Sequence, residues 1–264
     1  MRYQAVLAVI NEHSGSTVCA RYAIAMAASS GAELVLYNAH DERTPETVLR
    51  HCEQHLDQLF SVAFGLGIPV RRISETGLLA RLLPKRVAAE GAQLVFYPLL
   101  PDERYGAALQ QQTVHRLLSS VACDLSIMRI MHMGKLHPHQ ILVPLGRTIR
   151  DSEQRVRFLA ALAKSFHAQI TLFHRPERGQ NGVRQAVEQV RAGLAHHHLQ
   201  VLERSGSGPI GKAIALEAIS HHSDLIVVGA SERSALRRLF FGNPADDLLL
   251  SPPCNTILFR AALP

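Results

Sequence analysis

The sequence predicts an α/β protein built from two tandem domains, each with a five-stranded parallel sheet. Two observations support this fold class. Short runs of β-branched and apolar residues alternate with longer amphipathic segments, the pattern of parallel strands joined by crossover helices. The chain also matches itself, because segments of its first half recur in the same order in its second half.

The internal repeat consists of four matching segments with one change of spacing. At an offset of 136 residues, 3–10 aligns with 139–146 and 32–37 with 168–173. At an offset of 131 residues, 93–97 aligns with 224–228 and 117–129 with 248–260. The matches predict one domain over residues 1–131 and a second over residues 139–264, joined by a short linker.

The elements of the second half follow from hydrophobic periodicity. The predicted strands are residues 140–145, 169–173, 200–203, 224–228 and 256–259, and the predicted helices are residues 152–166, 183–196 and 210–221. In such sheets, ligands bind beyond the carboxyl ends of the strands, where the strand order reverses. The loops after the first and fourth strands are therefore the predicted ligand edge.

The loop after the fourth strand carries the most informative residues. Gly229 ends the strand, Glu232 follows three residues later, and Gly242 and Asn243 precede the last helix. Glycine lets a backbone approach a phosphate closely, and a helix N-terminus presents unpaired N–H groups and a positive dipole. The spacing indicates a cradle for the phosphates of a nucleotide.

With these residues the chain resembles the universal stress protein family, specifically its tandem two-domain members. The family's nucleotide-binding members carry Gly, two residues, Gly, nine residues, Gly and then Ser or Thr, and Gly229 and Gly242 have this spacing. Glu232 replaces the second glycine, Asn243 replaces the hydroxyl residue, and Gly146 stands where the family has an acidic residue that contacts adenosine. The resemblance implies an adenine nucleotide alpha hydrolase-like, Rossmann-like fold in each half. It also implies a pseudo-dimer within the chain, paired through the last strand of each half.

The resemblance implies an adenine nucleotide such as ATP, ADP or AMP as the ligand of the second domain, with Mg²⁺ as the cofactor to test beside it. The expected nucleotide-binding residues are Pro144, Leu145, Gly146, Phe173, His174, Gly229, Ala230, Glu232, Gly242, Asn243 and Pro244. Gly229, Gly242 and Asn243 would contact phosphate, whereas Phe173, His174 and the end of the first strand would line the base pocket. The carboxylate of Glu232 would repel a triphosphate unless it points outward or holds a metal.

The first domain is expected to have a degenerate site. The repeat places Pro98, Pro101, Gln111 and Gln112 opposite Gly229, Glu232, Gly242 and Asn243. Proline has no N–H to donate, and the Cβ of glutamine obstructs a close backbone approach. A structural role for the first domain follows.

Two alternatives to a nucleotide-binding stress-response sensor stay open. One is a scaffold or regulatory domain that binds no nucleotide and serves a protein partner, such as a stress regulator or a membrane transporter, since Gly229 and the G-N-P sequence also resemble transporter-associated stress-protein domains. The other is a weak ATPase, the least supported reading, because no nucleophile elbow, Cys/His pair or zinc motif appears. The segment 206–212 has the spacing of a phosphate-binding loop, but Ala213 stands where the Mg²⁺-binding Ser or Thr belongs.

Composition limits the partners and the compartment. The formal net charge is +6, but no basic stripe or aromatic platform is visible, so nucleic acid is not expected as a partner.

No run approaches the roughly 20 apolar residues of a membrane span, and four scattered cysteines fit a reducing, cytoplasmic compartment. The sequence leaves a homodimer open. The three consecutive histidines at 196–198 are expected at a solvated surface.

Overall fold

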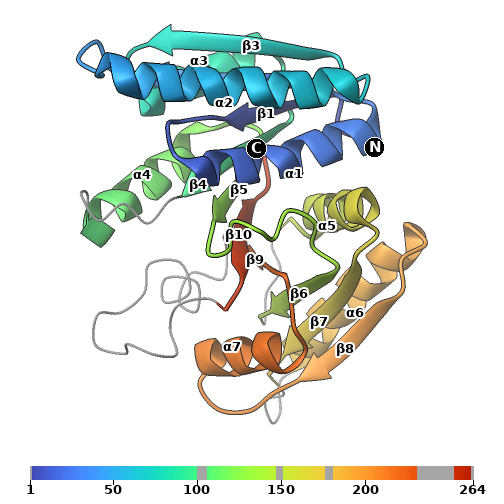
Figure 1. Ribbon diagram of the computed structural model, residues 1–264. Coiled ribbons are helices and arrows are strands. Elements are labelled where there is room, and N and C mark those ends of the chain that lie inside the picture. Colours follow the sequence, from blue (N-terminus) through green and yellow to red (C-terminus); the bar gives the residue numbers. More distant parts are fainter. Residues whose placement is uncertain (1, 100–105, 147–150, 176–180, 231–252, 263–264) are drawn as a thin grey trace. The chain divides into compact units, whose positions relative to one another are not determined.

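The computed structural model describes residues 2–99, 106–146, 151–175, 181–230 and 253–262 (Figure 1). The chain divides into two compact units. Unit 1 comprises Met1–Leu136 together with Ala261–Pro264, and unit 2 comprises His137–Arg260. The last residues of the chain, which the repeat assigns to the second domain, thus group with the first unit.

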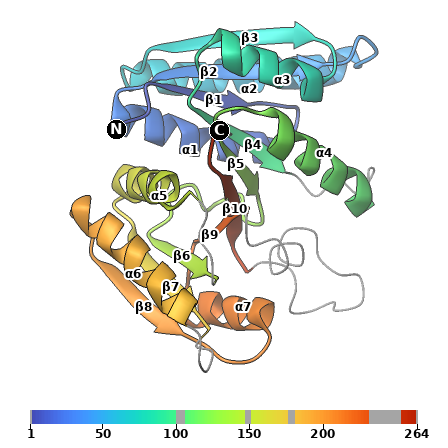
Figure 2. The same cartoon turned by 180° about the vertical axis from the view of Figure 1, so that it is seen from behind.

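Unit 1 alternates strands and helices throughout. Its elements are β1 (Ala5–Val9), α1 (Ser14–Ser30), β2 (Glu33–His40), α2 (Glu46–Gly65), β3 (Val70–Thr76), α3 (Leu79–Ala89), β4 (Leu94–Leu99), α4 (Gly106–Ser120) and β5 (Asp124–Arg129). The strands lie in the order β3-β2-β1-β4-β5, and every neighbouring pair is parallel. Helices α1 and α2 pack together on one face of the sheet, and α3 and α4 pack together on the other (Figures 1 and 2).

Unit 2 repeats this arrangement. Its elements are β6 (Gln140–Leu145), α5 (Ser152–Phe166), β7 (Gln169–His174), α6 (Asn181–His196), β8 (Val201–Ser205), α7 (Ile210–Ser220), β9 (Leu225–Gly229) and β10 (Asn255–Arg260). The strand order is β8-β7-β6-β9-β10, again with parallel pairs. The predicted α/β class with a five-stranded sheet in each half is confirmed, and the strands and helices predicted for the second half are present with ends shifted by at most two residues.

Burial explains why the strand order is stable. The central strands are buried along nearly their whole length, as expected where helices cover both faces of a parallel sheet. The outer strands β3 and β8 alternate half-buried and exposed residues instead. None of the helices in the described part of the chain is long and apolar enough to cross a membrane.

In both units, a side-chain hydrogen bond holds the backbone at the start of the first strand. In unit 1, the side-chain oxygen of Gln93 accepts the backbone N–H of Gln4 at 2.7 Å. In unit 2, Asp224, at the position that the repeat aligns with Gln93, accepts the backbone N–H groups of His139 and Gln140 at 2.9 and 3.1 Å. A side chain just before the fourth strand thus satisfies the amides that open the first strand in both units.

The end of the chain is tied to unit 1 by Asp124. This buried carboxylate accepts the hydroxyl of Tyr3 and the backbone N–H of Ala262, both at 2.7 Å. The pairing of the two last strands, on which the predicted pseudo-dimer rests, concerns the relation between the units and stays a prediction.

Candidate functional site

The strand order of unit 2 reverses between β6 and β9. From β6 the chain moves outward through β7 to β8, and it then returns through α7 to β9 on the other side of β6. The carboxyl ends of β6 and β9 flank this reversal, and they carry the predicted site residues Pro144 to Gly146 on one side and Gly229 on the other. In parallel α/β sheets this crevice is the usual ligand position.

A buried arginine occupies the crevice. Arg155 comes from the first turn of α5, and only 2% of its surface is exposed. Its Nη2 atom donates a hydrogen bond to the carbonyl oxygen of Pro144 at 3.0 Å. A Cβ atom added to Gly229 would lie 2.8 Å from its Nη1 atom, closer than any real contact of this kind. The guanidinium therefore lies between the ends of β6 and β9, and it gives Gly229 a reason to be glycine within this structure.

Arg155 was not among the predicted site residues. The sequence does contain a signal for it, because Arg155 lies at helical spacing from Leu159 and Leu162, which are both buried. A charged side chain on the apolar face of a helix is rarely fully buried unless the fold or a ligand uses it. The prediction missed Arg155 because only the apolar members of this face were considered.

Phe173 lies inside the unit. It is 1% exposed, and a Cβ atom on Gly206 would lie 2.7 Å from its Cζ atom. The ring therefore packs against the turn that leads from β8 to α7. Its predicted contact with a nucleotide base stays a prediction, and the structure gives the ring a packing role in the core.

His174 ends β7 beside the end of β6, where it pairs in register with Leu145. Its Nε2 atom lies 3.1 Å from Oε1 of Glu203. Its Nδ1 atom is buried and has no hydrogen-bond partner among the residues that the structure describes. Buried polar nitrogens are normally hydrogen-bonded, so this atom is a suitable contact for a ligand at this edge.

The backbone amide of Ala230 is already in use. It donates to the carbonyl oxygen of Phe259 at 2.8 Å, which extends the pairing of β9 with β10 by one bond. An amide engaged in this way is not presented to a phosphate. The part of the predicted cradle formed by Glu232, Gly242, Asn243 and Pro244 lies outside the described residues.

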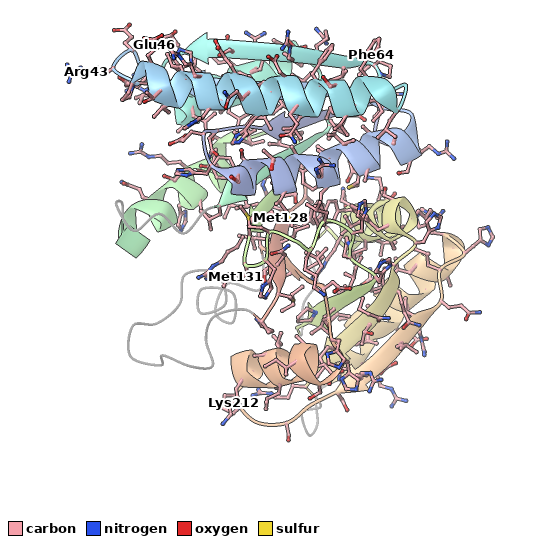
Figure 3. The ribbon with its side chains drawn as sticks, in the orientation of Figure 1. Arg43, Glu46, Phe64, Met128, Met131 and Lys212 are labelled. Atoms are coloured by element: carbon pink, nitrogen blue, oxygen red, sulfur yellow. The ribbon has the colours of Figure 1, made fainter. Side chains whose placement is uncertain are left out.

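The segment 206–212 comprises the turn between β8 and α7 and the first residues of α7. Gly208 has a φ of +86°, and its carbonyl oxygen accepts a hydrogen bond from Nη1 of Arg175 at 3.2 Å. Lys212 is exposed in the first turn of α7 (Figure 3). Within the described ranges, no group of three or more His, Cys, Asp or Glu side chains is placed to hold a metal ion.

At the corresponding edge of unit 1, the loop after β1 is held by its own hydrogen bonds. The hydroxyl of Ser16 donates to the carbonyl oxygens of Asn11 and His13, and the side chain of Asn11 accepts the N–H of His13. Nδ1 of His55 lies 2.9 Å from the carbonyl oxygen of Asn11. The predicted loss of a phosphate cradle in residues 98–112 stays a prediction, because part of this segment is outside the described residues.

Together, the fold and the crevice define a class: tandem parallel α/β domains with a ligand edge where the strand order reverses. The model of the universal stress protein family matches residues 138–260. The second half of the chain is therefore similar to the universal stress protein family, over a match that covers less than half of the whole chain.

Solved structures extend the fold, although not the function, to the whole chain. A protein of unknown function from Pseudomonas aeruginosa PAO1 is similar with a TM-score of 0.63 and 16% identity, covering 98% of this chain and 93% of that one. A universal stress protein from Archaeoglobus fulgidus DSM 4304 is similar with a TM-score of 0.62 and 12% identity, covering 98% of this chain and 96% of that one. A search of proteins with curated functions finds no significant match.

Proposed function

We propose that this protein is a stress-response or regulatory sensor that binds an adenine nucleotide, of the ATP, ADP or AMP kind, at the carboxyl edge of unit 2. The observation that carries the proposal is the buried guanidinium of Arg155 against Gly229. It puts a positive charge beside the glycine from which the phosphate-cradle spacing to Gly242 begins. A guanidinium that is shielded from water attracts the oxygens of a phosphate more strongly than an exposed one.

Two further groups support a ligand at this edge. Arg155 holds the carbonyl oxygen of Pro144, which fixes the end of β6 beside the crevice. The Nδ1 atom of His174 lies at the end of the neighbouring strand and has no hydrogen-bond partner in the part of the chain that the structure describes. A ribose hydroxyl, which both donates and accepts hydrogen bonds, would satisfy this nitrogen in either tautomer of the ring.

Calorimetric titration of the purified chain with ATP, ADP, AMP and cyclic dinucleotides, with and without Mg²⁺, tests the proposal. We expect one saturable site per chain, and at a ligand concentration one hundredfold above Kd the free energy of unfolding should rise by about 2.7 kcal/mol. The variant Gly242→Asp should abolish binding. Gln111→Asp, at the aligned position of the first half, is the matched control and should leave the affinity unchanged. Equal affinity of the wild type and Gly242→Asp would contradict the proposal.

Binding without turnover is part of the proposal. A regulatory protein of this kind should hold ATP through many hours of incubation without releasing ADP or phosphate. Production of ADP at a rate that Gly242→Asp reduces would instead identify a weak ATPase.

A second candidate function is a scaffold or regulatory domain for a protein partner, such as a stress regulator or a membrane transporter. It is favoured by the internal use of two predicted ligand groups, the packed ring of Phe173 and the engaged amide of Ala230. This candidate would be favoured if calorimetric titration shows no heat of binding, and thermal unfolding shows no shift in midpoint, with any of the nucleotides.

We also propose a cytoplasmic location and a pseudo-dimer within one chain. Support for the location is that the four cysteines, all in the described residues, form no disulfide. Sedimentation equilibrium distinguishes the pseudo-dimer, which would have the mass of one chain, from a homodimer.

A further inference from the structure

Three helix-to-strand turns of unit 2 have a histidine in the left-handed backbone region. They are His167 after α5, His198 after α6 and His222 after α7, with φ values of 51°, 60° and 49°. The repeat aligns these positions with glycines of unit 1, namely Gly31, Gly67 and Gly91, whose φ values are 70°, 72° and 59°. A residue with a Cβ atom is strained in this region and glycine is not. Folding alone therefore favours glycine, and the histidines call for another explanation.

All three histidines lie at the same edge of the unit 2 sheet. A helix-to-strand turn in a parallel sheet leads to the amino end of a strand, so this edge is opposite the candidate nucleotide site. Five more histidines precede strands at the same edge, and the full set is His137, His139, His167, His196, His197, His198, His221 and His222. We call this set the histidine edge. It holds more than half of the 15 histidines of the chain.

The histidine edge is continuous and accessible. Histidines precede four strands that are neighbours in the sheet, in the order β9-β6-β7-β8, and neighbouring strands are about 4.8 Å apart. Seven of the eight are exposed, and His197 is half-buried. The helix-to-strand turns of unit 1 contain no histidine. The set therefore belongs to one unit and does not follow from the fold that both units share.

Charged groups of both signs lie near the histidine edge. Asp224 is buried, and its carboxylate accepts the amides that open β6. Glu217, 13% exposed, pairs with Nδ1 of His221 at 3.0 Å and with Arg204 at 3.4 Å. Burial, and then the neighbouring charge of Lys164, lowers the pKa of His197. Among the described residues, both of these carboxylates are thus already engaged, Asp224 by backbone amides and Glu217 by Arg204 and His221.

One histidine of this edge makes an aromatic contact. His137 places its ring edge-on against Phe166, with ring centres 6.0 Å apart, so one apolar contact orients it while it remains exposed. A protonated imidazole offers two N–H donors, and the carboxylates of Asp and Glu are still ionised at the pH where this happens.

We infer that the histidine edge docks an acidic segment of a partner protein and that docking strengthens as the pH falls through the range in which imidazoles take up protons. The small permanent charge of the edge argues for this partner. Nucleic acids and anionic membranes are bound by clusters of Lys and Arg, because these side chains are positively charged at neutral pH. Imidazoles lack this permanent charge, and a protonated imidazole offers N–H donors to carboxylates.

Titration of the full chain with poly-L-glutamate at constant ionic strength tests the inference. We expect binding at about pH 6 to be at least about tenfold tighter than at about pH 8, because these values lie on either side of the ordinary imidazole pKa of about 6.5. The triple variant His167→Gly, His198→Gly, His222→Gly should unfold at a higher temperature than the wild type, because it relieves backbone strain. It should also lose most of the difference between the two pH values.

Two companion variants keep the test falsifiable. His137→Gln, His139→Gln, His196→Gln removes three exposed imidazoles of the edge without adding glycine, and it should weaken binding at about pH 6 to a similar degree. His51→Gln, His115→Gln, His132→Gln removes three imidazoles of unit 1 and should change nothing. Wild-type affinity in the glycine variant, equal affinity at both pH values, or tighter binding of an RNA oligonucleotide or of phosphatidylserine vesicles would each overturn the inference.

Discussion

The two units fill the crevice beside their first strand in opposite ways. Unit 2 has the large, charged side chain of Arg155 on its first helix against Gly229 at the end of its fourth strand. Unit 1 has the small side chain of Cys19 and the bulkier Pro98 at the aligned positions, and burial raises the pKa of the Cys19 thiol so that it stays neutral. The two units thus have different side chains at the same two positions of a shared fold. Of the two pairs of aligned positions, all among the described residues, the one in unit 2 carries a positive charge.

A second exchange occurs around the aligned residues Tyr37 and Phe173. In unit 1, the hydroxyl of Tyr37 donates to Glu75 at 2.7 Å, and Glu75 also pairs with Arg86. In unit 2, Phe173 lacks the hydroxyl, and Gly206 replaces Glu75, so the ring packs on a glycine instead. A polar network and an apolar contact thus occupy the same place in the two sheets. Phe173 therefore has a counterpart in unit 1 that serves the fold.

The largest effect should come from Arg155→Met, which removes the charge of the crevice and keeps most of the side-chain volume. Loss of a buried hydrogen bond from a charged donor to Pro144 should cost about 2–3 kcal/mol in the free energy of unfolding, measured by urea denaturation. Cys19→Ala, at the aligned position, is the control and should cost about 1 kcal/mol, the value of one small buried group. A cost for Arg155→Met no greater than that of the control would show that the guanidinium contributes nothing to folding.

Gly229→Ala should have the next largest effect. Its Cβ atom would meet the Arg155 guanidinium, which is held by Pro144 and cannot simply move away, so we expect a cost of about 1–2 kcal/mol. In the Arg155→Met background the same substitution should be nearly neutral. A double-mutant cycle measures this coupling, and additive costs would mean that the two residues do not compete for the same space.

Glu75→Gln tests the polar network of unit 1 through its pH dependence. Hydrogen bonds from Arg86 and then Tyr37 lower the pKa of Glu75 in the folded protein. Its contribution to stability is therefore present above the unfolded pKa of about 4.3, and it is lost as the pH falls through the lower, folded value. The variant should cost about 1 kcal/mol at neutral pH and should lose less stability than the wild type on acidification. Parallel pH profiles of the two proteins, from urea denaturation, would contradict this role.

The smallest effect should come from Gly31→His, which gives unit 1 the turn residue of unit 2. No atom lies within 4 Å of the new Cβ position, so the cost should be the backbone strain alone, about 1 kcal/mol. Gly65→Ala, which also meets no atom within 4 Å but has ordinary helical dihedrals, is the control and should stabilise slightly. Thermal unfolding of both variants measures the difference, and equal stabilities would remove the strain argument for the histidine turns.

The fold could be predicted from the sequence because its signals are local and occur twice. The periodicity of residues 152–166 alone defined α5 with its observed bounds. The candidate site was harder, because its geometry depends on contacts between distant segments. The ring of Phe173 packs against Gly206, more than thirty residues later in the chain. The residues next to Phe173 in the sequence contain no signal that predicts this contact. Likewise, the histidine turns become visible only when φ values are set beside the repeat.

The bond from Ala262 to Asp124 has a consequence for synthesis on the ribosome. The two residues are 138 positions apart, and the whole of unit 2 is translated between them. At bacterial-like elongation rates of roughly 5–20 residues per second, the first unit waits on the order of ten seconds for its final hydrogen bond. During that interval, the first unit lacks the bond between Ala262 and Asp124. Both units are therefore completed at the same time, when the last residues are translated.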